Sequence, residues 1–420
     1  MKERGHMAQL HEIKDQEERI ILLGVAVNEH DDTQESLEEL EELAKTAGAI
    51  TVAKVIQNRE SVHPGTYIGK GKMVEVRELV AELHATGVVC DDELSPVQLK
   101  NLEDELQTKV IDRTVMILDI FAQRATTKEG KIQVELAQLK YRSSRLIGLG
   151  NSLSRLGGGI GTRGPGEKKL EVDRRLIRDR ISQLNRELSE VKQSREVTRK
   201  QRSKNAVPVV AIVGYTNAGK STLLNSLTGA GVLEEDKLFA TLDPTTRNYT
   251  LESGQQVLFT DTVGFIRKLP HHLIEAFRST LEEAKYADII LHVVDGSNKS
   301  AYSQMHIVYE TLDNLGVKEK TIITAFNKQD RILDDQILKD FKADYTVKIS
   351  AKEKTGIKEL LNTIEEVLRN SKVLLEKVFS YAEAGKLQTI RKYGQLLEEE
   401  YRDDGIYIKA YVPREIYFGI

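Results

Sequence analysis

One stretch constrains this chain more than any other, and it reads VVAIVGYTNAGKST over residues 209–222. The five apolar residues 209–213 predict a buried parallel strand, and Gly214 ends it. The spacing from Gly214 to Ser221 is G-x-x-x-x-G-K-S, and the residues after it have helical apolar spacing. A strand, this glycine motif and a helix in that order predict a phosphate-binding loop.

Each residue type in this loop has a chemical reason. Glycines let successive N–H groups and the following helix N-terminus converge on phosphate oxygens. We expect Lys220 to place its charge on the β and γ phosphates and the Ser221 hydroxyl to ligate magnesium. The alternative, a glycine turn with an incidental Lys-Ser, is disfavoured by the full match in context. The predicted nucleotide contacts here are Gly214, Tyr215, Thr216, Asn217, Ala218, Gly219, Lys220, Ser221 and Thr222.

Two further segments follow in the order that a GTPase requires. Residues 239–247, FATLDPTTR, form a polar, threonine-rich segment in which a switch loop would bring a hydroxyl to magnesium and the γ-phosphate. Residues 257–264, VLFTDTVG, predict a strand that ends in Asp261. We expect Asp261 to hold magnesium, mainly through water, and the Gly264 N–H to sense the γ-phosphate; the intervening Thr262 and Val263 belong to the same contact segment.

The base-binding residues are expected at the ends of two later strands. Residues 321–330, TIITAFNKQD, end in an N-K-x-D motif. The Asp330 carboxylate can accept two hydrogen bonds from guanine N1–H and its exocyclic amine, a pair that adenine lacks. Asn327 and Lys328, with Gln329 between them and Asp330, would bind and cover the ring. Residues Ser350, Ala351 and Lys352 end another strand, where a backbone amide could meet guanine O6. All five motifs in order make coincidence negligible.

Length and composition bound the rest of the chain. Protein domains typically contain roughly 100–200 residues, so a chain of 420 residues is expected to form two to four domains. The sequence has no run of about 18 apolar residues, so we expect no membrane span, and its N-terminus lacks the apolar core of a signal peptide. The single cysteine, Cys90, excludes an internal disulfide framework and is expected to be a buried thiol in a reducing cytoplasm.

Residues 1–113 alternate strand-like and helix-like segments and predict a small parallel α/β domain. The expected strands lie at 20–27, 50–56, 88–90 and 110–111, and the expected helices lie near 37–44 and over 72–84 and 96–107. The basic loop 67–72 could touch phosphates, but a solvated glycine turn is at least as good an interpretation.

Residues 114–206 predict an antiparallel helical hairpin. Apolar residues recur at spacings of 4, 3, 4 and 3 in two stretches, 132–146 and 177–191. The short seam favours an intramolecular partner, so we expect a monomer. Residues 140–204 hold 18 lysines and arginines against 7 acidic residues, an excess of 11 positive charges in a chain of net charge −4. A local basic arm is therefore expected rather than attraction of the whole protein to nucleic acid, and no DNA partner is expected.

The loop of this hairpin, GGGIGTRGPG at 157–166, contains six glycines. Its G-x-G-x-x-G match is not a dinucleotide site, because no strand precedes it and no βαβ unit surrounds it. A flexible basic tip could instead reach into a phosphate-rich crevice, with a merely solvated loop as the alternative. The RNA-binding candidates are Arg155, Arg163, Lys168 and Lys169.

Residues 207–371 are predicted to be the nucleotide-binding domain, and residues 372–420 a small α+β appendix. In the appendix we expect strands at 373–379 and 406–412 and one helix over 383–400. Its aromatic residues could form an RNA surface, but a small aromatic core is the favoured interpretation. These residues are Tyr407, Tyr411, Tyr417 and Phe418.

Several of these motifs together resemble the HflX family of translation-factor-related GTPases: SRLGGGIGTRGPGEKKLEVDRR, GYTNAGKST, FATLDPTTR and DTVGFIRKLP. The resemblance covers most of the chain and implies the same order of an N-terminal α/β domain, a helical hairpin and a GTPase domain. It also implies binding of the large ribosomal subunit with its rRNA, and a role in ribosome splitting or rescue. GTP is the implied substrate and Mg²⁺ the implied metal.

The resemblance also implies residue roles. Ser221 and Thr241 are the implied magnesium ligands, although Thr245 and Thr246 offer competing hydroxyls. The switch residues expected near the nucleotide are Phe239, Ala240, Thr241, Leu242 and Asp243. Asn217 is similar to the asparagine that potassium-dependent relatives use to bind K⁺ near the phosphates, and a turn-forming role is its alternative.

One departure from Ras-like GTPases bears on mechanism. Phe265 stands where a water-orienting glutamine would be expected, and an apolar ring can neither donate a hydrogen bond to the attacking water nor accept one from it. We therefore expect slow intrinsic hydrolysis that the large subunit stimulates. Arg247 and Arg267 are weak candidates for an arginine finger. Adjacent His271 and His272 point to different helix faces, which disfavours metal binding.

Two other classes of function remain open at this point. One is a helicase-like RNA-remodelling protein whose nucleotide site could also use ATP, but Asp330 argues against adenine as the primary ligand and no separate helicase core is evident. A regulatory module that binds GTP as a ligand is kept open by the missing glutamine, although the magnesium and switch residues favour hydrolysis.

Overall fold

A computed structural model of the chain describes residues 17–28, 32–156, 165–203, 207–229, 238–239, 242, 244–269, 273, 283–332, 338–370 and 372–417. The chain forms two compact units, Met1–Met116 and Ile117–Ile420. Within the described ranges, no helix combines the length and the apolar character needed to cross a bilayer.

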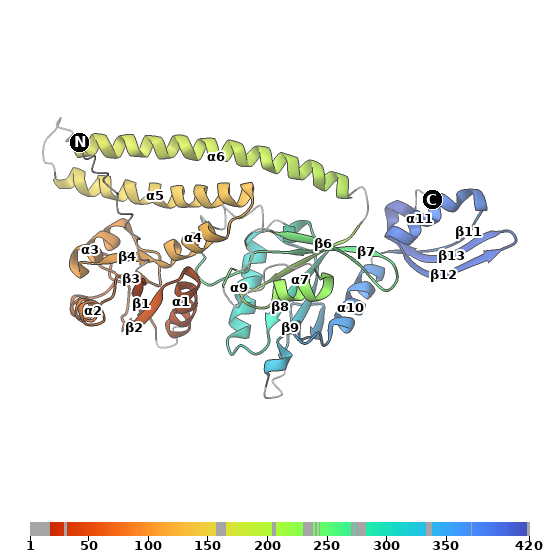
Figure 1. Cartoon of the computed structure of the whole chain (residues 1–420), viewed down its shortest axis with the longest axis horizontal. Coiled ribbons are helices and arrows are strands. Elements are labelled where there is room, and N and C mark those ends of the chain that lie inside the picture. The colour runs from red at the N-terminus through yellow and green to blue at the C-terminus, as the bar shows by residue number, and fades with distance from the viewer. Residues whose placement is uncertain are drawn as a thin grey trace, which may run out of the picture. The chain divides into compact units, whose positions relative to one another are not determined.

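The N-terminal unit is a parallel sheet with helices, as predicted (Figure 1). Its strands are β1 (Arg19–Ala26), β2 (Ile50–Asn58), β3 (Gly87–Cys90) and β4 (Lys109–Asp112), in the order β2-β1-β3-β4. Its helices are α1 (Thr33–Ala47), α2 (Lys70–Glu82) and α3 (Pro96–Leu106). The Cys90 thiol is fully buried in the core of this sheet, as predicted.

The elements that follow β4 are helices. They are α4 (Arg113–Arg124), α5 (Lys128–Leu156) and α6 (Pro165–Ser203). Helices α5 and α6 pack through Ile132, Leu136, Leu184 and Leu188, residues of the predicted seam. Arg180 clamps Glu135 across this seam with two hydrogen bonds of 2.7 and 2.9 Å. Helix α6 continues without a break to Ser203.

The nucleotide-binding region is a six-stranded sheet in the order β10-β9-β8-β5-β7-β6, parallel except for β6. The strands are β5 (Val209–Gly214), β6 (Thr245–Thr250), β7 (Gln256–Asp261), β8 (Ile289–Asp295), β9 (Thr321–Asn327) and β10 (Tyr345–Lys348). The helices are α7 (Lys220–Thr228), α9 (Ala301–Asn314), the short 3₁₀ helix η1 (Gln329–Arg331) and α10 (Ile357–Asn370).

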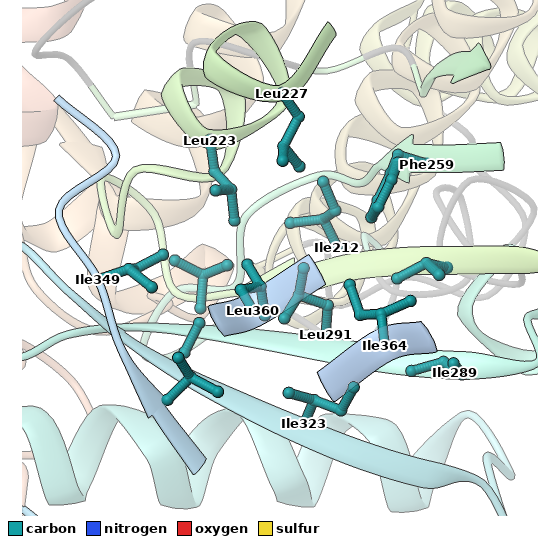
Figure 2. Packing of buried hydrophobic residues seen from close by; sticks show 14 of the residues in the cluster. Ile212, Leu223, Leu227, Phe259, Ile289, Leu291, Ile323, Ile349, Leu360 and Ile364 are labelled. Atoms are coloured by element: carbon teal, nitrogen blue, oxygen red, sulfur yellow. The ribbon is translucent and has the colours of Figure 1, made fainter. Parts of the chain in front are cut away.

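The core of this region lies between the sheet and helices α7 and α10. Figure 2 shows Leu223 of α7 and Leu360 of α10 near Ile212 of β5 and Leu291 of β8, and all four are fully buried. Each such side chain contributes about 1.5–3 kcal/mol when it leaves water. This packing fixes the strand ends on which the site residues stand.

The C-terminal region is an antiparallel sheet in the order β11-β13-β12. Its elements are β11 (Val373–Phe379), η2 (Tyr381–Glu383), α11 (Ala384–Tyr393), β12 (Gln395–Arg402), β13 (Gly405–Val412) and α12 (Arg414–Tyr417). The predicted single helix over 383–400 is wrong, because the chain leaves the helix at Gly394 and residues 395–402 pair with β13. Glu398, Glu399 and Glu400 favour a helix locally, but strand pairing overrides that preference.

The predicted aromatic core of this region is also wrong. The buried residues are mainly aliphatic, and Phe379 is the aromatic among them; the cluster is Leu375, Phe379, Leu387, Ile390, Ile406, Ile408, Ala410 and Val412. Alternation along β13 puts Tyr407 and Tyr411 on the opposite, half-exposed face. Tyr417 is partly exposed, and Phe418 lies outside the described residues.

Candidate nucleotide site

The phosphate-binding loop leaves β5 and enters α7 as the motif predicted. Gly219 has a φ of +95°, and a Cβ there would lie 2.3 Å from Nδ2 of Asn327, so glycine is required both by conformation and by space. Asn217 also has a left-handed φ, of +59°, and is exposed at the turn. The loop therefore presents backbone N–H groups ahead of the N-terminus of α7, where an anion is stabilised.

Lys220 is buried at the base of this loop. Its ammonium group donates a hydrogen bond of 2.7 Å to the carbonyl of Tyr215. Burial lowers the pKa of Lys220 to about 8, the nearby Asp261 carboxylate opposes this shift, and the Lys328 charge adds to it. A buried cation with a lowered pKa is stabilised by an anionic ligand, so the site suits phosphate.

Ser221 and Asp261 meet next to Lys220. The Ser221 hydroxyl donates to Oδ2 of the fully buried Asp261 over 2.8 Å, while the next residue, Thr262, donates to the carbonyl of Ile212 over 2.8 Å and fixes the end of β7. A hydroxyl and a carboxylate oxygen at this distance are the hard oxygen donors that Mg²⁺ prefers. These residues therefore fit a magnesium ion, although no cluster of three His, Cys, Asp or Glu side chains occurs among the residues that the structure describes.

The segment after Asp261 lies directly against the phosphate loop. A Cβ on Gly264 would lie 2.8 Å from Cγ2 of Thr216 and 3.0 Å from Nζ of Lys220. Phe265 forms a short parallel bridge to the loop: Thr216 N donates to its carbonyl over 2.8 Å, and its own N–H donates to the Gly214 carbonyl over 3.1 Å. The Phe265 ring is 1% exposed, so this side chain packs in the interior.

The hydroxyl groups of Thr216 and Tyr215 lie on the phosphate loop next to this segment. The hydroxyl of Thr216 is buried and has no hydrogen-bond partner in the described part of the chain. Such a group is costly unless something satisfies it, which favours a polar ligand at the loop. The Tyr215 hydroxyl accepts a hydrogen bond of 2.8 Å from the Arg267 N–H, and the buried Arg267 guanidinium donates to Ser303 over 3.0 Å. This conformation holds Arg267 in the domain interior, unlike an arginine finger.

The base-binding motif is tied to the phosphate loop and to the end of β10. Nδ2 of Asn327 donates to the carbonyl of Ala218 over 2.9 Å, and its Oδ1 accepts from the N–H of Ala351 over 2.9 Å. Oδ1 of Asp330 accepts from the Ser350 hydroxyl over 2.5 Å, a hydrogen bond that holds the pKa of Asp330 below its ordinary value. The Asp330 carboxylate is thus ionised, and the hydrogen bond from Ser350 holds it beside the segment that follows β10.

Lys328 has a partner that the sequence analysis did not assign. Its ammonium group lies 2.7 Å from Oδ2 of Asp295, at the end of β8, and the N–H and hydroxyl of Ser297 both donate to Oδ1 of Asp295. The signal was present, because Asp295 ends a buried strand that neighbours the N-K-x-D strand. The ion pair fixes the direction in which the Lys328 stem leaves the strand.

Some predicted residues lie outside the described part of the chain: Ala240, Thr241, Asp243, Arg163, His271 and His272. The side chains of Arg155, Lys168 and Lys169 also lie outside it. Phe239 and Leu242 are buried, and the Phe239 ring makes an edge-to-face contact with Phe121 at 4.6 Å between centroids.

The competing hydroxyls of the switch segment lie at the start of β6. Thr246 Oγ1 lies 3.0 Å from Thr260 Oγ1, and Thr245 is paired with Asp261 across the two strands. Arg247, the other arginine-finger candidate, donates to the carbonyl of Thr246 over 3.2 Å and is exposed.

Three family profiles match the chain in succession. They are described as GTP-binding GTPase N-terminal over residues 34–122, GTP-binding GTPase Middle Region over 124–202, and 50S ribosome-binding GTPase over 209–328. A crystal structure of a GTP-binding protein from Sulfolobus solfataricus in complex with GDP is similar, with 25% identity, a TM-score of 0.44, and coverage of 83% of this chain and 98% of that one.

Curated relatives match along almost the whole chain. The GTPase HflX of Lacrimispora saccharolytica is 67% identical over 99% of this chain and 98% of its own length. The GTPase HflX of Caldanaerobacter subterraneus is 49% identical over 97% and 94%, and that of Escherichia coli is 41% identical over 89% and 88%. With the motifs joined in one site, these matches show that the chain belongs to the HflX family and is a GTPase.

Proposed function

We propose that this chain is a GTP-driven switch that binds the large ribosomal subunit, including its rRNA, and leaves it after hydrolysis. The observation that carries the proposal is the hydrogen bond from Asn327 to the Ala218 carbonyl, which joins the base-binding and phosphate-binding parts into one site. The partner is supported by the family profile described as a 50S ribosome-binding GTPase.

GTP binding in this proposal uses residues that the fold already orders. The Asp330 carboxylate exchanges its hydrogen bond with Ser350 for two donors on the guanine edge, and Lys328, held by Asp295, covers the ring. The N–H groups of the loop, the Thr216 hydroxyl and Lys220 bind the phosphates. Ser221 and Asp261 would hold Mg²⁺, with Thr241 as a further ligand, and the ion would neutralise charge on the β and γ phosphates.

The γ-phosphate is sensed by the segment that carries Gly264. This segment lies within contact distance of Lys220 and Thr216. A phosphate bound next to Lys220 therefore either displaces the segment or accepts a hydrogen bond from the Gly264 N–H. Phe265 offers the attacking water no polar atom. Intrinsic hydrolysis is therefore slow, and the large subunit stimulates it by ordering the switch segments or by supplying the missing group.

Further parts of the proposal follow the family resemblance. The chain works as a cytoplasmic monomer in ribosome splitting, rescue or recycling. The tip of its hairpin meets rRNA through Arg155, Arg163, Lys168 and Lys169, and a K⁺ ion binds beside Asn217. The four-part division at residues 113, 206 and 371 separates the modules that make these contacts.

Sedimentation tests the ribosomal partner directly. The chain is mixed with purified 30S, 50S or 70S particles in Mg²⁺ and K⁺ buffer, with a non-hydrolysable GTP analogue or GDP, and pelleted through a sucrose cushion. We expect co-sedimentation with 50S that is stronger with the analogue, and a loss of 70S in the same buffer. Equal recovery with 30S and 50S, or recovery with neither, contradicts the proposal.

A further inference from the structure

An almost fully exposed aromatic ring stands on the segment between η1 and β10. Phe341 is 89% exposed, the highest value among the exposed large apolar residues of the described chain. A single exposed apolar side chain needs no explanation by itself. The conformation of the segment that carries it is the informative observation.

The residues on either side of Phe341 are anchored in the domain interior. Leu338 packs on a buried cluster that includes Met305 and Phe326. The Asp340 side chain is 2% exposed, and its carboxylate accepts hydrogen bonds of 2.6 Å from the hydroxyls of Tyr309 and Thr324. Burial by itself raises the pKa of Asp340, but the nearby His292 and these hydrogen bonds outweigh it and hold the pKa well below its ordinary value. A buried, ionised carboxylate therefore anchors the segment.

Backbone hydrogen bonds fix the segment further. The N–H of Lys342 donates to Oδ1 of Asp340 over 3.0 Å, and the N–H of Lys339 donates to the Tyr302 hydroxyl over 3.2 Å. At the other end, Asp344 and Ile322 exchange hydrogen bonds of 2.8 and 2.9 Å. The Phe341 ring is therefore presented outward by an ordered support and does not point outward through local disorder.

The charged residues described next to the ring are two exposed lysines, the buried Asp340 and the exposed Asp344. Lys339 and Lys342 flank it and are exposed, and the Lys342 ammonium group lies 4.9 Å from the centre of the Tyr309 ring. Tyr302 is 53% exposed beside Lys339, whereas the charge of Asp340 is buried. An exposed ring between two lysines suits a nucleic acid strand, because bases stack on aromatic faces and lysines attract phosphates.

We propose that Phe341 is an RNA-stacking residue: its ring stacks on an unpaired base of the large-subunit rRNA, and Lys339 and Lys342 meet the adjacent phosphates. This inference rests on the proposed function, since the RNA is that of the proposed partner. It adds a contact on the nucleotide-binding region to the basic hairpin loop.

Photo-crosslinking identifies what the ring touches. The full-length chain with p-benzoylphenylalanine in place of Phe341 is bound to 50S subunits with a non-hydrolysable GTP analogue and irradiated, and the adduct is digested with ribonuclease or protease. We expect a ribonuclease-sensitive adduct on rRNA. An adduct on a ribosomal protein overturns the RNA assignment, and so does the absence of any adduct when binding is confirmed in the same sample.

Substitutions measure the contribution of the ring. Phe341→Ala is expected to weaken 50S binding roughly tenfold, while Phe341→Tyr keeps the stacking face and wild-type affinity. Hydrolysis without subunits is unchanged in both variants, which shows that the domain is folded. Tyr401→Ala, at a side chain 67% exposed in the C-terminal sheet, is the matched control and is expected to bind normally.

The failures of the two proposals are distinguishable. If wild-type protein does not bind 50S, the proposed function is wrong. If wild-type protein binds and Phe341→Ala binds equally well, the stacking inference alone is wrong. An equal loss in Tyr401→Ala also overturns the inference, because the effect would then not belong to position 341.

Discussion

The two parallel sheets of this chain end their strands in different ways. In the N-terminal unit, polar groups beyond β3 and β4 bind one another: the buried Arg113 guanidinium binds Asp91 over 2.7 Å and also contacts Glu39 and Ser36. The Asp112 carboxylate accepts hydrogen bonds from the N–H groups of Leu94 and Val115, of 3.0 and 3.1 Å. In the nucleotide-binding sheet, the same end of the strands carries glycines, a buried lysine and a threonine hydroxyl that has no hydrogen-bond partner among the described residues.

This difference shows that the carboxyl edge of a parallel sheet permits a ligand site but does not make one. The N-terminal edge already buries the carboxylates of Asp91 and Asp112 beside Arg113, so an anion would gain little there. The edge near Lys220 leaves a buried cation to be stabilised by a ligand.

Removing the buried cation of the nucleotide site is expected to have the largest effect. Lys220→Ala should slow GTP hydrolysis roughly 10³-fold, because the charge that faces the β and γ phosphates is lost. Phosphate release at saturating GTP measures it, with exposed Lys358→Ala as the matched control. Thermal unfolding without nucleotide, compared with wild type, checks that the variant is folded. Hydrolysis within about tenfold of wild type would contradict this role for Lys220.

The N-terminal edge should respond in stability and not in nucleotide binding. Arg113→Met removes the positive charge that balances Asp91 and Glu39 and should lower the free energy of unfolding of the N-terminal unit by about 3 kcal/mol. Hydrogen exchange of the amides of β3 measures this locally, and exposed Arg77→Met is the control. The affinity for GTP should stay at the wild-type value. A parallel loss of GTP affinity would mean that this edge also serves the nucleotide.

The proposed function assigns base selection to a single carboxylate, that of Asp330. Asp330→Asn should weaken GTP binding by about 2–3 kcal/mol, because an amide cannot accept both guanine donors. The same variant should gain affinity for xanthosine triphosphate, whose oxygen can accept from the new amide. Competition titrations with GTP, ATP and xanthosine triphosphate measure the preference. Unchanged discrimination would refute the assignment of Asp330 to the base.

The smallest expected effect is a pH dependence of GTP binding. Burial lowers the pKa of Lys220 to about 8 in the nucleotide-free fold, whereas bound phosphates favour the charged form and raise it. Binding near pH 8 should therefore take up a proton, and affinity should fall as pH rises through 8, by at most about tenfold per unit. Calorimetry in buffers of different ionisation enthalpy measures the uptake. The absence of any uptake near pH 8 would mean that Lys220 is already fully charged.

Much of the fold follows from local patterns. The strand before Gly214 and the helix after it were predictable because their residues are apolar with the correct periods, and the hairpin seam followed from its heptad spacing. Residues 395–402 were not predictable in this way. Their helix-favouring glutamates pair with β13, and that pairing depends on residues that follow in the sequence.

The candidate site likewise contains residues that short motifs predict and contacts that they do not. Lys220, Ser221, Asp261 and Asp330 belong to motifs whose chemistry can be read from short spacings. The ion pair of Lys328 with Asp295 and the anchoring of Asp340 by Tyr309 and Thr324 join segments that no local spacing relates. Such contacts depend on strand order, which a sequence pattern specifies only through the folded sheet.

The most direct test of the account is GTP turnover at saturating GTP in Mg²⁺ and K⁺ buffer, with and without purified large ribosomal subunits. Since the buried Phe265 ring offers no polar atom to the attacking water, the account predicts slow turnover alone and at least about tenfold stimulation by the subunits. Unchanged turnover, with binding confirmed in the same samples, would contradict the claim that the large subunit triggers hydrolysis.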